Sequence, residues 1–335
     1  GDQVVILNGR TVTTAIARTI GSLTIQQGGT LDIGATSGSN FGTVDGSGLL
    51  KLSSVNFPSG SFSQFIAATG GTVEYYNLPG GTNTLSTLAT YNNLTFSNST
   101  ATSYVATTNN NNLTLNGSLT MVSTSTGVPS FRIGNTTGNR TLTVLGDVTI
   151  GANTSVGVTS YNGAHSFNIH GNLSVNGDLT LQNGAPYTAA TNGRAILTFL
   201  GATQNTVANF GPTANATLYD VKVNKNEGYE IFISASPTSI VNFYGAGATV
   251  EPLLGTMRLG QNINIPVLNA PNAGNYDIGA PGVLPVLWID GATVTDGGVS
   301  GAIVPYGTIR ITSGTLNVIN GQRSVVIRES GLLKI

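Results

Sequence analysis

The sequence predicts an all-β fold, a parallel β-helix (β-solenoid) with irregular turns of roughly 25 residues. Three observations lead to this prediction. Apolar–x–apolar triplets recur along the chain, short segments rich in Gly, Asn and Asp separate them, and charged residues make up only 8% of the 335 positions. The triplets and the corner residues are typical of short strands joined by sharp corners. The low content of charged residues is typical of sheets in which equivalent side chains lie over one another, because stacked like charges repel.

The triplets are clearest in the middle of the sequence, where successive triplets start six residues apart. LTLNGSLTM covers residues 113–121, LTVLGDVTI covers 142–150 and FNIHGNLSVNGDLTL covers 167–181. Looser versions, with steps of eight and seven residues, cover 23–33 and 309–318. Because the units restart at intervals of 29 and 25 residues, the pattern favours a coil with several short strands in each turn. The alternative architecture is a pair of antiparallel β-sandwiches, which also contain regularly spaced strands.

Period-two alternation places the first and third residues of each triplet on the same face of a strand. We expect these inward residues to be Leu113, Leu115, Leu142, Val144, Phe167 and Ile169. The residues between them, Thr114, Thr143 and Asn168, are expected on the outer face. Signals for helix are nearly absent, and residues 63–69 are long enough for a single turn at most.

The composition fits such a stack and excludes several classes of protein. The chain contains 46 Thr, 35 Asn and 28 Ser, which with 45 Gly make up nearly half of it. Stacked like charges repel, whereas stacked Thr, Asn and Ser can hydrogen-bond to their copies on the next turn. A net charge of -1 gives no electrostatic footprint for nucleic acid, and no apolar run is long enough for a membrane span. The absence of Cys excludes disulfides and thiolate chemistry.

Residues with catalytic or metal-binding chemistry are scattered along the chain. No two of the 14 acidic residues are adjacent, although carbohydrate-active β-helices need clustered carboxylates. Glu227 and Glu230 are close in sequence, but in a loop or strand their side chains are not expected to converge. His165 and His170, the only histidines, fall on opposite faces of an extended segment. We therefore assign no catalytic, cofactor-binding or metal-ligating residue, expect no cofactor, and predict that the chain is not an enzyme.

Other conspicuous residues have ordinary structural explanations. Asn-x-Ser/Thr sequons, among them Asn93, Asn112 and Asn172, are expected by chance at this content of Asn and Thr, and no glycosylation is inferred. The eleven Tyr, among them the adjacent pair Tyr75–Tyr76, are expected to cap the hydrophobic interior rather than to stack on sugar rings. Trp288 lies in an apolar strand, so it is expected to be buried or on a strand face rather than to bind a ligand.

Several segments resemble the repetitive secreted surface proteins of Bacteroidetes. They are GDQVVILNGRTVTTAIARTIGSLTIQQGGTLDIG (1–34), GTVEYYN (71–77), YNNLTFSN (91–98), HSFNIHGNLSVNGDLTL (165–181), VLWIDGATV (286–294) and GTIRITSGTLNVINGQRSVVIRESGLLKI (307–335). The resemblance implies a right-handed parallel β-helix, export by the type IX secretion system and an adhesin-like role. The C-terminal sorting domain of that family is not visible in this sequence.

The functional hypothesis is a non-enzymatic extracellular β-solenoid, structural or adhesin-like, on the cell surface or secreted through the type IX system. Residues 1–335 are expected to form one elongated domain, part of a longer polypeptide, because the sequence stops within a strand triplet at Leu333–Ile335. We expect further turns or a partner to cover that C-terminal end. Other expected partners are surface glycans, other surface proteins and, during export, the secretion translocon. The alternative function is a β-helix that binds or cleaves polysaccharide.

Overall fold

Short parallel strands make up the structure, a computed structural model that describes residues 1–85, 88–108, 111–134, 138–158, 163–183, 193–243, 250–268, 276–296, 303–318, 325 and 331–335. They form a parallel β-solenoid with a spacing of about 25 residues per turn, as the triplets predict. The paired strands whose register the structure describes are parallel, so the alternative of antiparallel sandwiches is wrong. The chain divides into two compact units, residues 1–136 with 140–156 (unit 1) and residues 137–139 with 157–335 (unit 2).

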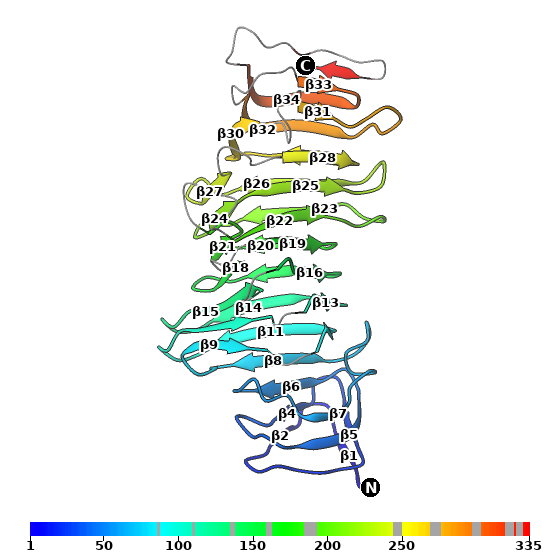
Figure 1. Ribbon diagram of the computed structural model, residues 1–335, viewed down its shortest axis with the longest axis vertical. Coiled ribbons are helices and arrows are strands. Elements are labelled where there is room, and N and C mark those ends of the chain that lie inside the picture. The colour runs from blue at the N-terminus through cyan, green and yellow to red at the C-terminus, as the bar shows by residue number, and fades with distance from the viewer. Residues whose placement is uncertain are drawn as a thin grey trace. The chain divides into compact units, whose positions relative to one another are not determined.

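Unit 1 begins with turns of two strands and continues with turns of three. A long sheet carries one strand from each turn (Figure 1). Its strands are β2 (Thr11–Thr13), β4 (Thr30–Asp32), β6 (Leu49–Leu52), β8 (Thr72–Tyr76), β11 (Asn93–Asn98), β14 (Leu119–Ser123) and β17 (Val148–Ile150). In the two-strand turns the other strands are β1 (Gln3–Ile6), β3 (Ser22–Ile25), β5 (Asn40–Asp45) and β7 (Ser59–Ser61). In the three-strand turns they are β10 (Thr90–Tyr91), β13 (Leu113–Leu115) and β16 (Thr141–Val144) on one side, with β9 (Gly81–Thr84), β12 (Tyr104–Thr107) and β15 (Pro129–Ile133) on the other.

Unit 2 repeats the three-strand turn. Its long sheet contains β20 (Leu173–Val175), β23 (Thr206–Phe210), β26 (Glu230–Ala235), β29 (Thr256–Leu259), β32 (Val286–Asp296), β34 (Thr308–Asn317) and β35 (Leu332–Lys334). A second sheet contains β19 (Ala164–Ile169), β22 (Arg194–Phe199), β25 (Asp220–Asn224) and β28 (Val250–Leu254), and a third contains β21 (Asp178–Thr180), β24 (Asn215–Leu218) and β27 (Ile240–Phe243). β30 (Asn264–Leu268) pairs with β32, and β31 (Tyr276–Ile278) pairs with β33 (Ile303–Pro305). The division between the units falls within β18 (Ser155–Val158).

The core is built from columns of apolar side chains that lie over one another in register. Alternate residues of a strand face inward, and a residue paired with an inward residue in a parallel strand also faces inward. One apolar residue per turn therefore generates a continuous column. One column of unit 1 consists of Leu31, Leu50, Val73, Leu94, Leu119 and Val148, all buried. Tyr75 and Phe96 stack in register with ring centres 5.8 Å apart, and Phe96 also stacks across the core on Phe131 of another sheet, with ring centres 5.0 Å apart.

The inward positions predicted from the triplets are confirmed. All six predicted inward residues are buried, and the three residues between them are half-buried on the opposite face of the same strands. Leu113 and Leu119 begin successive triplets but belong to different sheets, because the chain turns a corner between them. The six-residue step is therefore one strand and one corner. In residues 63–69 the chain makes a short turn, with the Ile66 N–H donating to the Phe62 carbonyl.

Asparagine side chains connect the corners of successive turns. At five corners an Asn Oδ1 accepts a hydrogen bond of 2.8–3.0 Å from a backbone N–H that lies 25 to 35 residues later, one turn along the solenoid. The pairs are Asn93 with Ser118, Asn112 with Thr141, Asn139 with Ala164, Asn172 with Val207 and Asn205 with Glu230. Leu94 pairs with Leu119 in the adjacent strands, so Asn93 and Ser118, one residue earlier in each strand, occupy equivalent positions on successive turns. These amides therefore satisfy N–H groups at corners, where the strand ladder is interrupted.

A close backbone approach requires glycine at the corner after β5. Gly46 has φ of 102°, and a Cβ atom at this position would lie 2.1 Å from the carbonyl oxygen of Ile25 on the preceding turn. Both facts exclude a side chain, because positive φ is costly for other residues and the contact is with backbone that cannot move aside. Corner glycines of this kind let successive turns approach to the separation of paired strands.

Substituting Leu115 with Asp is expected to abolish the cooperative thermal unfolding transition of unit 1. Leu115 is fully buried, and an unpaired buried charge costs several kcal/mol. The matched control is Thr114→Asp, which introduces the same charge on the adjacent, half-buried outward position. Circular dichroism melting curves compare the two. A Leu115→Asp protein that melts like the wild type would show that the inward assignment is wrong.

Replacing Asn93 with Ala is expected to lower the free energy of unfolding by about 1 kcal/mol, because it removes the acceptor for the Ser118 N–H. Asn93→Asp keeps an oxygen acceptor at that corner and should recover most of the loss. Asn209→Ala is the control, since Asn209 is exposed on a strand and its Oδ1 accepts a long hydrogen bond of 3.5 Å from the Ser234 hydroxyl. Urea unfolding measures all three. Equal losses for Asn93→Ala and Asn209→Ala would contradict the corner role.

Candidate functional site

One column of outward side chains on the long sheet of unit 2 carries cations and aromatic rings. Strand pairing places Phe232 opposite Arg258, Arg258 opposite Trp288, Trp288 opposite Arg310 and Arg310 opposite Lys334. Each of these residues follows a residue that faces the interior, so its own side chain faces outward. The solenoid geometry thus collects five residues that are far apart in the sequence. We call this set the outer column.

The rings and guanidinium groups of the outer column stack directly. The guanidinium carbon of Arg258 lies 4.7 Å from the centre of the Phe232 ring and 4.2 Å from the centre of the Trp288 ring. The guanidinium carbon of Arg310 lies 4.0 Å from the centre of the Trp288 ring. Because Arg258 and Arg310 come from the strands on either side of β32, the indole lies between two cations. Such contacts are attractive and hold each guanidinium in a defined orientation.

Asp290 anchors this stack from the neighbouring outward position of β32. Its Oδ2 accepts hydrogen bonds from Arg258 Nε at 2.9 Å and Nη2 at 2.5 Å. Its Oδ1 accepts hydrogen bonds from the hydroxyls of Thr312 at 2.7 Å and Ser313 at 3.2 Å. The Thr312 hydroxyl in turn accepts a hydrogen bond of 2.8 Å from Trp288 Nε1. The Thr312 hydrogen bond, followed by those of Arg258, lowers the pKa of the Asp290 carboxyl below its ordinary value.

A second polar cluster lies on the long sheet of unit 1. Lys51 Nζ is 3.3 Å from Glu74 Oε2, and Glu74 Oε1 accepts a hydrogen bond of 2.5 Å from the Ser97 hydroxyl. Lys51 also lies 4.8 Å from the ring centre of Tyr76, whose hydroxyl donates to Asp32 at 2.9 Å. Beside Glu74 is a shallow groove of about 360 Å³, lined by the side chains Thr30, Ser47, Leu49, Thr72, Glu74 and Thr95 and by corner glycines. It presents hydroxyl groups and one carboxylate.

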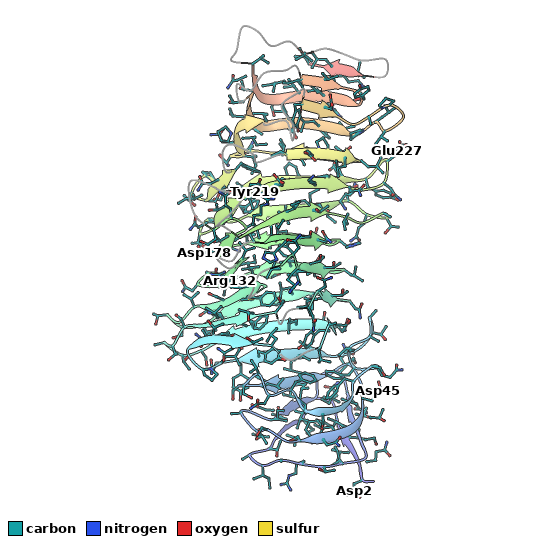
Figure 2. All side chains as sticks on the ribbon, viewed as in Figure 1. Asp2, Asp45, Arg132, Asp178, Tyr219 and Glu227 are labelled. Carbon is teal, nitrogen blue, oxygen red and sulfur yellow. The ribbon has the colours of Figure 1, made fainter. Side chains whose placement is uncertain are left out.

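The two glutamates and two histidines singled out in the sequence are not brought together. Figure 2 shows Glu227 at an outer corner of unit 2, between β25 and β26, whereas Glu230 starts β26 and lies 3.6 Å from Arg258 Nη1. His165 faces the interior of β19 and is fully buried. His170 lies at the bend after that strand, where burial and the charge of Lys225 lower the pKa of its imidazole. In the described part of the chain, no three His, Asp or Glu side chains gather in a way that could hold a metal ion.

Lys225 is a buried cation with a structural role. Its side chain is fully buried in the corner after β25, and Nζ donates hydrogen bonds of 3.0 Å and 3.2 Å to the carbonyls of Leu200 and Gln204. Burial lowers the pKa of its ammonium group. The two acceptors belong to the corner of the preceding turn, so Lys225 connects two corners as the asparagines do elsewhere.

Tyr75 and Trp288 lie where the sequence predicts them, whereas Tyr76 does not cap the interior, because it is the outward residue of the alternating strand β8. Tyr75 is fully buried and its hydroxyl is 3.1 Å from that of Tyr91, while Tyr76 faces outward beside Asp32. Trp288 is half-buried on a strand face. The sequence did not predict the pairing of Trp288 with Arg258 and Arg310. A signal for it exists, because each of the three is the middle residue of an apolar–x–apolar triplet.

No known protein family, curated protein or solved structure matches this chain. The resemblance to secreted surface proteins of Bacteroidetes therefore stays a prediction. Within the described residues there is no helix with the length and apolar character needed to cross a bilayer.

Acidification is expected to change the fluorescence of Trp288, the only tryptophan of the chain, as the Asp290 carboxylate becomes protonated. The folded-state pKa is lowered, so the stabilising network is complete above the ordinary carboxyl pKa of about 3.9 and is lost as the pH falls through the lower value. Emission spectra between pH 7 and pH 2 measure the transition, with circular dichroism to confirm that the fold persists. Asp290→Asn is the control and should remove this step. A midpoint above the ordinary value would contradict the network.

Proposed function

We propose that this chain is a non-enzymatic extracellular segment, structural or adhesin-like, which acts by presenting repeated polar surfaces on a stiff scaffold. The observation that carries the proposal is the register of its outward hydroxyl groups. On the long sheet of unit 1, Thr95, Thr120 and Thr149 pair in sequence, so that equivalent hydroxyls recur on successive turns. A surface of this kind offers many equivalent weak contacts, and their combined effect can exceed the affinity of any one of them.

The mechanical part of the proposal rests on the connections between turns. Each turn is joined to the next by strand pairing and by corner hydrogen bonds such as that between Asn93 and Ser118. A load applied along the stack is therefore shared by many parallel bonds. The extracellular location, presentation on the cell surface and export through the type IX translocon are supported by the sequence resemblance. Surface glycans or other surface proteins are the proposed partners.

The second candidate function is binding or cleavage of polysaccharide, and the groove beside Glu74 favours binding. Its walls supply the hydroxyls of Thr30, Ser47, Thr72 and Thr95, which suit the hydroxyls of a sugar. Hydrolysis by the usual route requires two carboxylates that flank the scissile bond. Glu74 is engaged by Lys51 and Ser97, and the groove lining contains one carboxylate.

Bead adhesion tests the proposed function. The purified chain is coupled to beads at graded densities, and retention on surfaces coated with neutral or acidic polysaccharides is compared with binding of the free chain. We expect retention to rise steeply with density, reaching about a hundredfold over single-chain binding. The same polysaccharides are incubated with the free chain and assayed for new reducing ends, and none are expected. Reducing ends that accumulate with time and are lost in Glu74→Gln would overturn the proposal in favour of cleavage.

A further inference from the structure

In the described part of the chain, two cations of the outer column lie on paired strands with no acid between them. Arg310 of β34 pairs directly with Lys334 of β35, and both side chains are exposed. Like charges at directly opposed positions destabilise a sheet. Three other outward lysine and arginine residues on strands have carboxylate partners: Lys51 with Glu74, Lys222 with Glu251, and Arg258 with Glu230 and Asp290. The Arg310–Lys334 pair departs from this pattern.

Among the described residues, the acid on the strand next to Arg310 is Asp290, and it is already engaged. Both oxygens of Asp290 are occupied, one by Arg258 and the other by the hydroxyls of Thr312 and Ser313. Arg310 has no ion pair or hydrogen bond to any described side chain, and its guanidinium rests on the Trp288 ring. The ring orients the guanidinium while its five N–H donors remain available to a ligand. An oriented guanidinium next to a second cation is suited to a carboxylate, which it can bind through two parallel hydrogen bonds.

The surroundings of the pair indicate what carries the carboxylate. Along β34 after Arg310, the hydroxyls of Thr312 and Ser313 already donate to Asp290, whereas Thr315 and Asn317 present an exposed hydroxyl and an exposed amide group. These groups suit the hydroxyls that flank the carboxylate of a uronic acid. Glu230 and Asp290 lie on the same face and would repel a polymer with a dense, continuous negative charge, such as nucleic acid. The isolated cation pair fits a chain that carries one carboxylate on each sugar ring.

The geometry points to a binding site for uronic-acid polysaccharides at Arg310 and Lys334, with Trp288 as its supporting ring. This inference rests on the proposed function, because it names the glycan that one face of an adhesin-like segment binds. The guanidinium of Arg310 holds the carboxylate, the ammonium of Lys334 adds charge attraction, and Thr315 and Asn317 of β34 contact the sugar. A bound carboxylate would also relieve the repulsion between the two cations.

Titration of the full chain with polygalacturonate, followed by the fluorescence of Trp288, tests the site. Neutral dextran and dextran sulfate are titrated in parallel, because they separate a general sugar effect and a general anion effect from recognition of a carboxylate. The variants are Arg310→Gln and Lys334→Gln. Arg10→Gln is the matched control, since Arg10 is an exposed arginine of unit 1 and its loss changes the net charge equally. Lys334→Gln keeps the Trp288 stack intact, and circular dichroism confirms that each variant is folded.

Arg310→Gln is expected to weaken apparent polygalacturonate affinity about tenfold, the effect of losing one charge-assisted contact, with a smaller loss in Lys334→Gln and none in Arg10→Gln. Equal losses in Lys334→Gln and Arg10→Gln would overturn the site, as would tighter binding of dextran sulfate or equal binding of dextran. Bead retention on neutral polysaccharide should be unchanged in both site variants. Failure of the site therefore leaves that retention intact, whereas failure of the proposed function removes it.

Discussion

Each strand of this protein hydrogen-bonds in parallel to the strand one turn before it and the strand one turn after it, and the remaining features depend on that pairing. Parallel pairing in register places side chains at equivalent positions of successive turns next to one another. The residue at one position therefore contacts its counterparts on the turn before and the turn after. Apolar positions become columns such as the one from Leu31 to Val148. Outward positions become columns of hydroxyls or, in unit 2, of rings and guanidinium groups.

The corner asparagines give the abundance of sequons a physical explanation. At Asn93, Asn112 and Asn172 the Asn side chain bonds to the backbone of the next turn, the following Leu faces inward, and the Thr or Ser after it faces outward. A corner followed by an alternating strand therefore produces Asn-x-Ser/Thr wherever a small hydroxyl residue occupies the outer face. The amides act differently from the expected ladders of stacked Asn, because Oδ1 bonds to backbone N–H groups rather than to another amide.

Several of the few charged residues on the long sheets lie next to a residue of opposite charge. On the long sheets, Lys51 and Arg258 each have a carboxylate partner on a neighbouring strand, as expected where like charges would otherwise be stacked. Arg310 is different because, within the residues that the structure describes, an aromatic ring and not an acid supports it. Trp288 thereby belongs both to the fold, through its half-buried position on β32, and to the surface on which we place a glycan site.

By itself, the sequence determined the fold class, the inward residues and the length of a turn, because a two-residue alternation and Gly- or Asn-rich corners are local properties that need no partner to be recognised. Leu115 and Phe167 were assignable in this way. Only the tertiary structure decided which outward residues meet. Arg258, Trp288 and Arg310 are separated by 30 and 22 residues, and their contact depends on the lengths of the intervening corners, which vary from turn to turn. Small changes in corner length alter the register, so the outer column emerged only when the turns were stacked.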